Sequence, residues 1–223
     1  MKWLEANCLR PNPSPTKGVR YVKTKEDLMA RSKRVASPTG VYHWITRGIN
    51  RKHLFHFFED YLRFRELLSE YRAIHGIQIF HYCFMPNHVH MLLYAPDLDS
   101  MAKFSHFILR RYTYYYCKVR GWAGSVFQKG YKSLVVEKDS YLLECGRYIE
   151  RNPIKAALSE KLENYPYSSF RFYSEGKEDN LITPSPAYLG LSDDPDERRK
   201  IYSEYVNQIR VVDEMVGSEL LKT

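Results

Sequence analysis

The order of apolar patterns along residues 41–152 constrains the fold of this chain most strongly. Segments rich in β-branched and aromatic residues alternate with segments whose apolar side chains recur every three or four positions, as they do in helices. The expected elements are a strand at 41–47, a helix at 59–74, strands at 77–84 and 88–94, a helix at 100–119, a strand at 133–137 and a helix from 139 or 140 to 152. This order suits an antiparallel sheet with helices on one face, and therefore predicts an α+β fold of the ferredoxin-like type.

Charge divides the chain into three segments. Residues 1–37 carry nine Lys/Arg against three acids, residues 38–174 nineteen against twelve, and residues 175–223 six against eleven. We therefore expect a basic N-terminal arm with one short helix near 25–34, a central catalytic domain, and an acidic C-terminal tail with one helix near 196–215. The formal net charge of +8 indicates a polyanionic partner, of which nucleic acid is the commonest.

The cysteines and the apolar segments exclude several classes of protein. The four cysteines lie far apart without a C-x-x-C pair, which argues against a cysteine zinc site and against a disulfide framework. No apolar run approaches the roughly 18 residues of a membrane span, and residues 1–10 lack the apolar core of a secretion signal. These features predict a cytoplasmic protein that does not contact a membrane.

His88-Val89-His90 is the sharpest local motif. Alternate side chains of a strand point to the same face, so His88 and His90 converge while Val89 enters the core. Two imidazoles about 7 Å apart along a strand can share one divalent metal ion, although the pair does not select the metal. On this pair alone, histidines without a ligand remain the commoner interpretation.

A second motif lies at the end of the last expected helix, in residues 147–153. Tyr148 and Asn152 are four positions apart, so a helix places the phenol and the amide on one face. Pro153 then ends or tightens the helix. On this segment alone, the simpler interpretation is a tyrosine near a helix end followed by an asparagine as a C-terminal stop.

Five segments together resemble a known family. Residues 84–93 are similar to the histidine–hydrophobe–histidine signature of the single-tyrosine transposases of simple insertion sequences. Four further segments resemble the branch called REP-associated tyrosine transposases, and they lie at residues 45–51, 127–133, 147–158 and 165–170. Their order and spacing match across roughly residues 40–173, which leaves the arm and the tail outside the resemblance.

The resemblance implies an HUH endonuclease-like fold and a role for each matching residue. It implies that His88 and His90 ligate a divalent metal, that Asn152 completes the metal site, and that Tyr148 is the nucleophile. An amide oxygen favours a hard ion, so we expect Mg²⁺ or Mn²⁺. The family also implies single-stranded hairpin DNA such as a REP element as the partner, a 5′-phosphotyrosine intermediate in DNA transposition, and a bacterial protein associated with the nucleoid.

Further candidate residues lie in or near these segments. A phenol has a pKa near 10, so only about one in a thousand is ionised at neutral pH, and we expect the metal or a cation such as Arg147 or Arg151 to lower that value. The chain departs from the family at Phe127, where Trp is usual, and at 129–130, where Gly-Arg is usual. The candidate DNA contacts are Arg47, Asn50, Arg51, Arg110, Arg111, Lys132, Arg147 and Arg151.

Several alternatives stay open. A former transposase kept as a non-catalytic DNA-binding protein would bind DNA without metal and tolerate Tyr148→Phe. A metal-dependent nucleotide hydrolase of the histidine-triad type would need a third alternating histidine, where Leu92 stands. Residues 1–37 suit either a DNA-gripping arm or a disordered tail, and the acidic tail could fold over the basic groove. The protein could be a monomer or a homodimer in which the tyrosine helix serves the partner's metal site.

Overall fold

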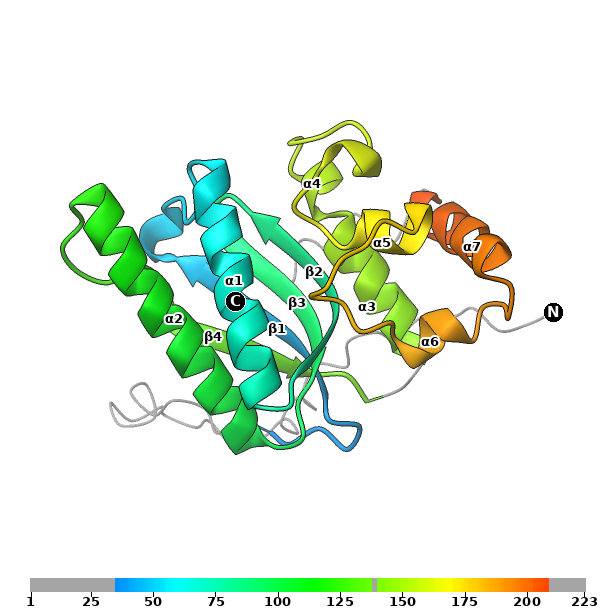
Figure 1. Ribbon diagram of the computed structural model, residues 1–223, viewed down its shortest axis with the longest axis horizontal. Coiled ribbons are helices and arrows are strands. Elements are labelled where there is room, and N and C mark those ends of the chain that lie inside the picture. Colours follow the sequence, from blue (N-terminus) through cyan, green and yellow to red (C-terminus); the bar gives the residue numbers. More distant parts are fainter. Residues whose placement is uncertain (1–34, 138–139, 209–223) are drawn as a thin grey trace, which may run out of the picture. The chain divides into compact units, whose positions relative to one another are not determined.

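The computed structural model describes residues 35–137 and 140–208, and the described residues from Ala36 onward belong to one compact unit. Its centre is a four-stranded antiparallel sheet with the strand order β2-β3-β1-β4 (Figure 1). The strands are β1 Val41–Gly48, β2 Gln78–Met85, β3 His88–Tyr94 and β4 Phe127–Val135. The helix expected near residues 25–34 lies outside the described residues. The helix expected near 196–215 is shorter than expected, because it ends at Asn207.

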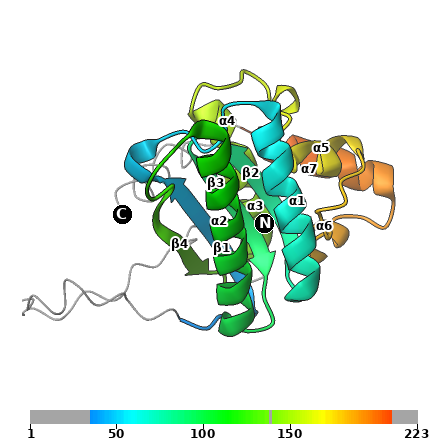
Figure 2. The same ribbon diagram turned by 60° about the vertical axis from the view of Figure 1, so that its left-hand side comes forward.

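Helices cover both faces of this sheet. Helices α1 (Phe58–Ile74) and α2 (Leu98–Arg120) lie side by side on one face, as Figure 2 shows. Helix α3 (Ser140–Glu150) packs on the other face, against β2 and β3. The described elements up to β4 run strand, helix, strand, strand, helix, strand, so the ferredoxin-like α+β fold expected from the sequence is confirmed. The expectation that the helices cover one face only is corrected, because α3 packs on the second face.

Alternation along the strands separates two apolar clusters. On β3, Val89 and Met91 point toward α1 and α2, and Leu92 points toward α3. On β1, Trp44 is fully buried on the α1–α2 side, where its indole N–H donates to Ser105 Oγ at 2.9 Å. Val89 therefore enters the core as expected, and the two histidines that flank it face α3.

Two differences from the expected elements bear on the site. Strand β4 begins at Phe127 rather than at residue 133. Lys129 and Gly130 take positive φ angles within it, and the register with β1 shifts between Thr46 and Gly48. This irregularity interrupts the alternation from which a strand is predicted. Helix α3 ends at Glu150, and a new short helix, α4 (Asn152–Lys155), begins at Asn152. Pro153 lies in the first turn of α4, where backbone N–H groups have no intrahelical acceptor. The N–H that proline lacks therefore costs no hydrogen bond there.

The described part of the acidic tail packs into the same unit as the sheet. Helix α5 (Phe170–Glu175) contacts α7 (Pro195–Asn207), and both α7 and the short α6 (Pro186–Leu189) contact α3. Tyr202 and Val206 of α7 are fully buried. The remaining elements are the 3-10 turns η1 (Ile49–Arg51) and η2 (Leu162–Asn164). Within the described ranges, no helix combines the length and apolar character needed to cross a bilayer.

The buried carboxylate of Asp60 joins the start of α1 to the end of α2. It accepts hydrogen bonds from the backbone N–H groups of His56 (2.8 Å) and Phe57 (3.1 Å), from the hydroxyl of Tyr115 (2.9 Å) and from the guanidinium of Arg120 (2.5 Å). Burial alone would raise the pKa of Asp60, but these donors lower it below its ordinary value. The carboxylate therefore stabilises the fold as an anion.

We expect Asp60→Asn to lower the free energy of unfolding by about 2–4 kcal/mol at neutral pH, because the amide cannot satisfy all four donors. Since the folded pKa is depressed, this contribution is present above the unfolded carboxyl pKa and is lost as the pH falls through the folded pKa. Urea unfolding at about pH 7 and about pH 3 measures both effects, with the exposed Asp99→Asn as the control. A difference from wild type that is equally large at both pH values would contradict this account.

Candidate active site

His88 and His90 lie on the sheet face that α3 covers, with their ring centroids 4.9 Å apart. Strand β1 adds two side chains to the same face. Arg47 lies directly opposite His88 in the β1–β3 register, and His43 lies opposite Leu92. Cross-strand partners share a face, so the strands bring three imidazoles and one guanidinium together.

Hydrogen bonds define which ring nitrogens remain available. His88 Nδ1 lies 2.6 Å from the amide oxygen of Asn87, which can only accept, so Nδ1 carries the proton and Nε2 keeps its lone pair. His90 Nδ1 lies 2.9 Å from His43 Nε2. His90 Nε2 is buried and makes no hydrogen bond to any described residue. A buried nitrogen without a partner is unusual and suits a ligand.

The electrostatic surroundings keep these imidazoles neutral at pH 7. Burial lowers the pKa of His43 to about 4, and burial followed by the charge of Arg47 lowers that of His88 to about 4. Burial and the neighbouring His88, His43 and Arg47 lower the pKa of His90 well below its ordinary value. Neutral imidazole is the metal-binding form, and a ligand histidine commonly uses its second nitrogen in a hydrogen bond, so this pair fits a divalent ion.

Tyr148 extends from α3 toward the same histidines. Its ring centroid lies 6.1 Å from that of His90 and 5.9 Å from that of His43, and both contacts are edge-on. Burial, and to a lesser extent the Cys145 thiol, raise the pKa of Tyr148 to about 12, while Arg47 lowers it. The expectation that Arg147 or Arg151 would lower this pKa is therefore corrected, because the guanidinium that acts on Tyr148 comes from β1.

Asn152 lies one helical turn beyond Tyr148. Its Nδ2 donates to the carbonyls of Tyr148 (2.9 Å) and Ile149 (3.1 Å). The amide oxygen takes no part in these two bonds. No hydrogen bond joins Asn152 to either histidine in the described chain. The described residues contain no group of three or more His, Cys, Asp or Glu that could hold a metal ion. A metal on His88 and His90 thus requires a third ligand such as this amide oxygen.

A pocket of about 350 Å³ opens beside His88. It lies between the β2–β3 turn and the residues after α4, and its rim carries the cations Arg47 and Arg51. Asn50 and Arg51 adopt left-handed backbone conformations, and the carbonyl of Arg51 accepts from Asn87 Nδ2 at 3.2 Å. The full lining is Arg47, Arg51, His53, Met85, Pro86, Asn87, His88, Ala156 and Leu158.

The candidate DNA contacts divide into three groups. In the first group, Arg47 and Arg51 line the pocket, and Asn50 is exposed beside Arg51 in η1. Lys132 belongs with them, because it is exposed on the same sheet face, in one cross-strand row with Ile45 and His90. In contrast, Arg110 and Arg111 are exposed on α2, which covers the opposite sheet face, so the structure does not bring them to this site.

Arg147 and Arg151 form the third group, and the structure gives them another role. Arg147 is 2% exposed, and its guanidinium donates to the carbonyls of Tyr205 (3.2 Å) and Gln208, while Arg151 donates to the carbonyl of Val206 (2.8 Å). These carbonyls end α7, where backbone acceptors lack intrahelical partners and attract cations. The expectation that Arg147 contacts DNA is therefore wrong for this arrangement, because its charge is buried against α7.

His43 is the residue of this site that the sequence analysis missed. It lies 45 positions before His88 in the chain, and only the β1–β3 register brings it to His90. The available signal was the alternation of His43, Ile45 and Arg47 along one strand, which places all three on one face. That signal needs the strand order before it can be used.

The chain belongs to the IS200-like transposase family, because residues 37–152, just over half of its length, match the family model described as "Transposase IS200 like". The family expected from the sequence is thereby confirmed. No curated protein matches the chain.

Two solved structures are similar to this one. The first is a REP-associated tyrosine transposase bound to a REP hairpin, with 17% identity and a TM-score of 0.57 over 70% of this chain and 93% of that chain. The second is a Deinococcus radiodurans R1 protein assigned as a transposase, with 18% identity and a TM-score of 0.39 over 58% of this chain and 95% of that chain. The first likeness supports the fold described above.

Proposed function

We propose that this protein is a metal-dependent single-stranded DNA endonuclease and strand transferase, a transposase in which Tyr148 forms a phosphotyrosine intermediate. The observation that carries the proposal is the placement of Tyr148 edge-on against His43 and His90, beside the buried His90 Nε2 that has no partner among the described residues. A nucleophile and a metal-binding nitrogen at one point of the sheet suit phosphoryl transfer.

His88, His90 and Asn152 are the residues that would hold Mg²⁺ or Mn²⁺. All three are neutral ligands, so the bound ion keeps its full charge for the substrate. When bound, such an ion polarises and orients the scissile phosphate as a Lewis acid. The hydrogen bonds of Asn87 to His88 and of His43 to His90 hold both rings in place for this task.

Tyr148 supplies the covalent step. Its phenol oxygen forms a bond to phosphorus as the bond between phosphorus and the DNA 3′ oxygen breaks, and the phenol proton is released as the leaving 3′ oxygen takes up a proton. The resulting phosphodiester conserves the bond energy, so a free DNA hydroxyl reverses the step and joins a new strand. The pKa of about 12 means that Tyr148 is protonated when DNA arrives, and Arg47 favours its ionisation.

We propose single-stranded hairpin DNA of the REP type as the substrate. The similar solved structure is a complex with a REP hairpin, which supports this class of partner. Arg47, Arg51 and Lys132 offer positive charge on the side of the sheet where Tyr148 lies, which suits a phosphate backbone. The basic arm of residues 1–37 is proposed as an additional backbone contact, and the nucleoid as the site of action.

We also propose that Tyr148 acts on the metal site of its own chain. The tyrosine contacts His43 and His90 of the same chain, and α3 is tied to α7 of the same chain through Arg147 and Arg151. These contacts support a site that is complete within one chain.

A denaturing gel tests this function. Labelled single-stranded hairpins from the flanks of the protein's own gene are incubated with protein and Mg²⁺, Mn²⁺ or EDTA. The proposal predicts a covalent protein–DNA band that requires metal. DNA binding without a covalent band, across several hairpins and both ions, would instead identify a former transposase kept for DNA binding.

Substitution of two arginines distinguishes the proposed DNA surface from the contacts that stabilise α3. We expect Arg47→Ala to weaken hairpin binding by about 1 kcal/mol and to reduce the salt slope by about one, because one phosphate contact is lost. Arg147→Ala should leave both quantities unchanged and lower the free energy of unfolding by about 1–3 kcal/mol, because carbonyls at the end of α7 lose their donor. Filter binding at several salt concentrations and urea unfolding measure both variants. Equal losses of DNA affinity in the two variants would contradict this distinction between Arg47 and Arg147.

A further inference from the structure

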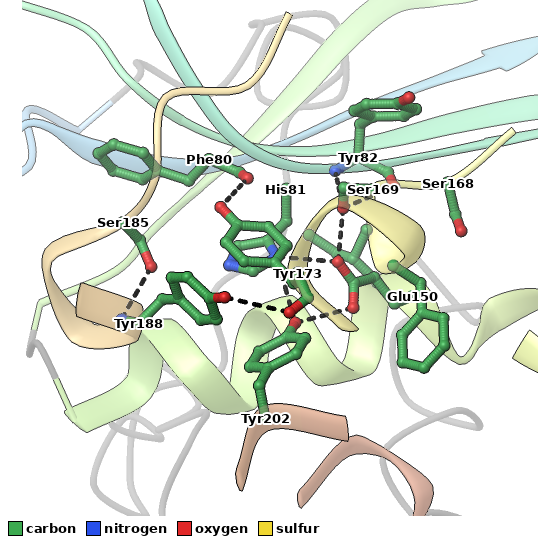
Figure 3. Close-up of polar contacts among 12 residues, drawn as sticks. Phe80, His81, Tyr82, Glu150, Ser168, Ser169, Tyr173, Ser185, Tyr188 and Tyr202 are labelled. Atoms are coloured by element: carbon green, nitrogen blue, oxygen red, sulfur yellow. Dashed lines mark hydrogen bonds and ion pairs between the residues drawn. The ribbon is translucent and has the colours of Figure 1, made fainter. Parts of the chain in front are cut away.

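A buried carboxylate lies at the meeting point of α3, β2, α5 and α7 (Figure 3). Glu150 is fully buried, and three donors converge on it. The hydroxyl of Ser169 donates to Oε1 at 2.5 Å, the hydroxyl of Tyr202 donates to Oε2 at 2.7 Å, and Nδ1 of His81 donates to Oε1 at 3.0 Å. None of these groups belongs to the site described above.

The position of Glu150 on α3 links this network to Tyr148. Successive helical residues are rotated by about 100°, so Tyr148 and Glu150 lie on opposite flanks of Ile149, which is fully buried against the sheet. One flank reaches His90 of β3, and the other reaches His81 of β2. A rotation of α3 about its axis that displaced Tyr148 would therefore also break the contact between Glu150 and His81.

Close packing around His81 leaves little freedom for that rotation. A Cβ atom at Gly146 would lie 2.7 Å from His81 Nε2, so the imidazole rests directly on the backbone of α3. On its other side the ring stacks on Tyr173 with 4.3 Å between centroids, and the hydroxyl of Tyr173 donates to the carbonyl of Phe80 at 2.5 Å. The imidazole is thus held between α3 and an aromatic ring that is itself bonded to β2.

Hydrogen bonds to a buried carboxylate are among the stronger ones in proteins, and removing one donor leaves charge unsatisfied. Ser169 strengthens the link to the sheet, because its Oγ also accepts from the backbone N–H of Tyr82 at 3.0 Å. Tyr202 links the same carboxylate to α7. The three donors therefore hold one flank of α3 against both a strand and a helix.

We propose that Glu150, with His81, Ser169 and Tyr202, is the positioning device that holds Tyr148 over the metal-binding histidines. The inference deepens the proposed function and rests on Tyr148 being the nucleophile. Two of its residues, Ser169 and Tyr202, lie beyond Asn152, where the match to the family model ends. The segment that follows the family domain therefore contributes to the reaction by positioning α3, and it does not contact the substrate.

Two matched variants test the proposal. Tyr202→Phe removes one donor from Glu150, and Tyr188→Phe removes a hydroxyl from the same aromatic cluster, where it donates to the carbonyl of Tyr173 at 3.1 Å. Both rings are buried and contact Tyr173. A purely structural role predicts similar behaviour for the two variants.

The position of residue 148 is read from the ¹⁹F resonance of 3-fluorotyrosine incorporated there in the full chain without metal. The reaction is read from the single-turnover rate of covalent product at saturating hairpin DNA, beside the Kd for DNA. We expect Tyr202→Phe to shift and broaden the resonance and to lower the rate roughly ten-fold while the Kd stays within about two-fold. Tyr188→Phe should match wild type in all three. Glu150→Gln, which keeps the side-chain shape, should resemble Tyr202→Phe.

Each outcome decides one proposal. If Tyr202→Phe and Glu150→Gln leave both the resonance and the rate at the values of Tyr188→Phe, the positioning role is overturned. If wild type forms no covalent product on any hairpin, the proposed function fails, and the ¹⁹F resonance alone decides whether the network holds residue 148. A variant too unstable to purify is replaced by Ser169→Ala, which removes a different donor from the same carboxylate.

Discussion

Replacing Tyr148 with phenylalanine is expected to abolish the covalent protein–DNA product while hairpin affinity and stability stay close to wild type. The variant lacks only the oxygen that attacks phosphorus, so the rate should fall by at least about 10³-fold, as it does when other enzymes lose a covalent nucleophile. The ring contacts with His43 and His90 remain, and the free energy of unfolding should change by less than about 1 kcal/mol.

Tyr141→Phe is the matched control for this experiment. Tyr141 lies on the same helix, and its half-buried ring packs against the same apolar cluster as that of Tyr148. We expect it to retain the covalent product at the wild-type rate. An undiminished product from Tyr148→Phe would assign the nucleophile to another residue and overturn the proposed site.

The second large effect is expected from His90→Ala. The substitution removes the buried Nε2 that has no hydrogen-bond partner among the described residues, so Mn²⁺ affinity should fall by at least about 100-fold and the covalent product should disappear with it. Titration of the variant with Mn²⁺, followed by the electron paramagnetic resonance of the free ion, measures binding without reference to activity. His88→Ala, at a half-buried position, should give the same loss with less effect on the fold.

His106→Ala is the control for metal binding. His106 is exposed on α2, which covers the opposite face of the sheet, so its loss should leave the Mn²⁺ affinity unchanged. Wild-type Mn²⁺ affinity in both His88→Ala and His90→Ala would show that the histidine pair does not hold the ion. The metal dependence of the proposed function would then need another site.

Much of the architecture follows from local sequence patterns. The strand expected at residues 88–94 has those limits in the structure, and alternation correctly placed Val89 in the core and both histidines on the opposite face. The spacing of Tyr148 and Asn152 likewise predicted one helical turn between them, although the turn includes the break between α3 and α4. These features depend on periodicity along one segment, which a sequence displays directly.

Contacts between distant segments could not be obtained in this way. Arg147 and Arg151 look like DNA-binding residues until α7 is placed beside them, because a guanidinium suits a helix C-terminus as well as a phosphate. His43 joins the site only through the β1–β3 register. In the sequence Glu150 is one charged residue on a helix, and only the fold brings His81 and Tyr202 to it as hydrogen-bond donors. In each case the partner is far away in the chain and has no local signature.

Peptide mapping shows whether Tyr148 becomes covalently joined to DNA. The wild-type protein is reacted with a hairpin in Mn²⁺, the DNA is trimmed with nuclease, and the digested protein is analysed by tandem mass spectrometry. We expect a nucleotide linked through its 5′ phosphate to the oxygen of Tyr148. A nucleotide on any other residue, or a strand cleaved without any nucleotide left on the protein, would contradict it.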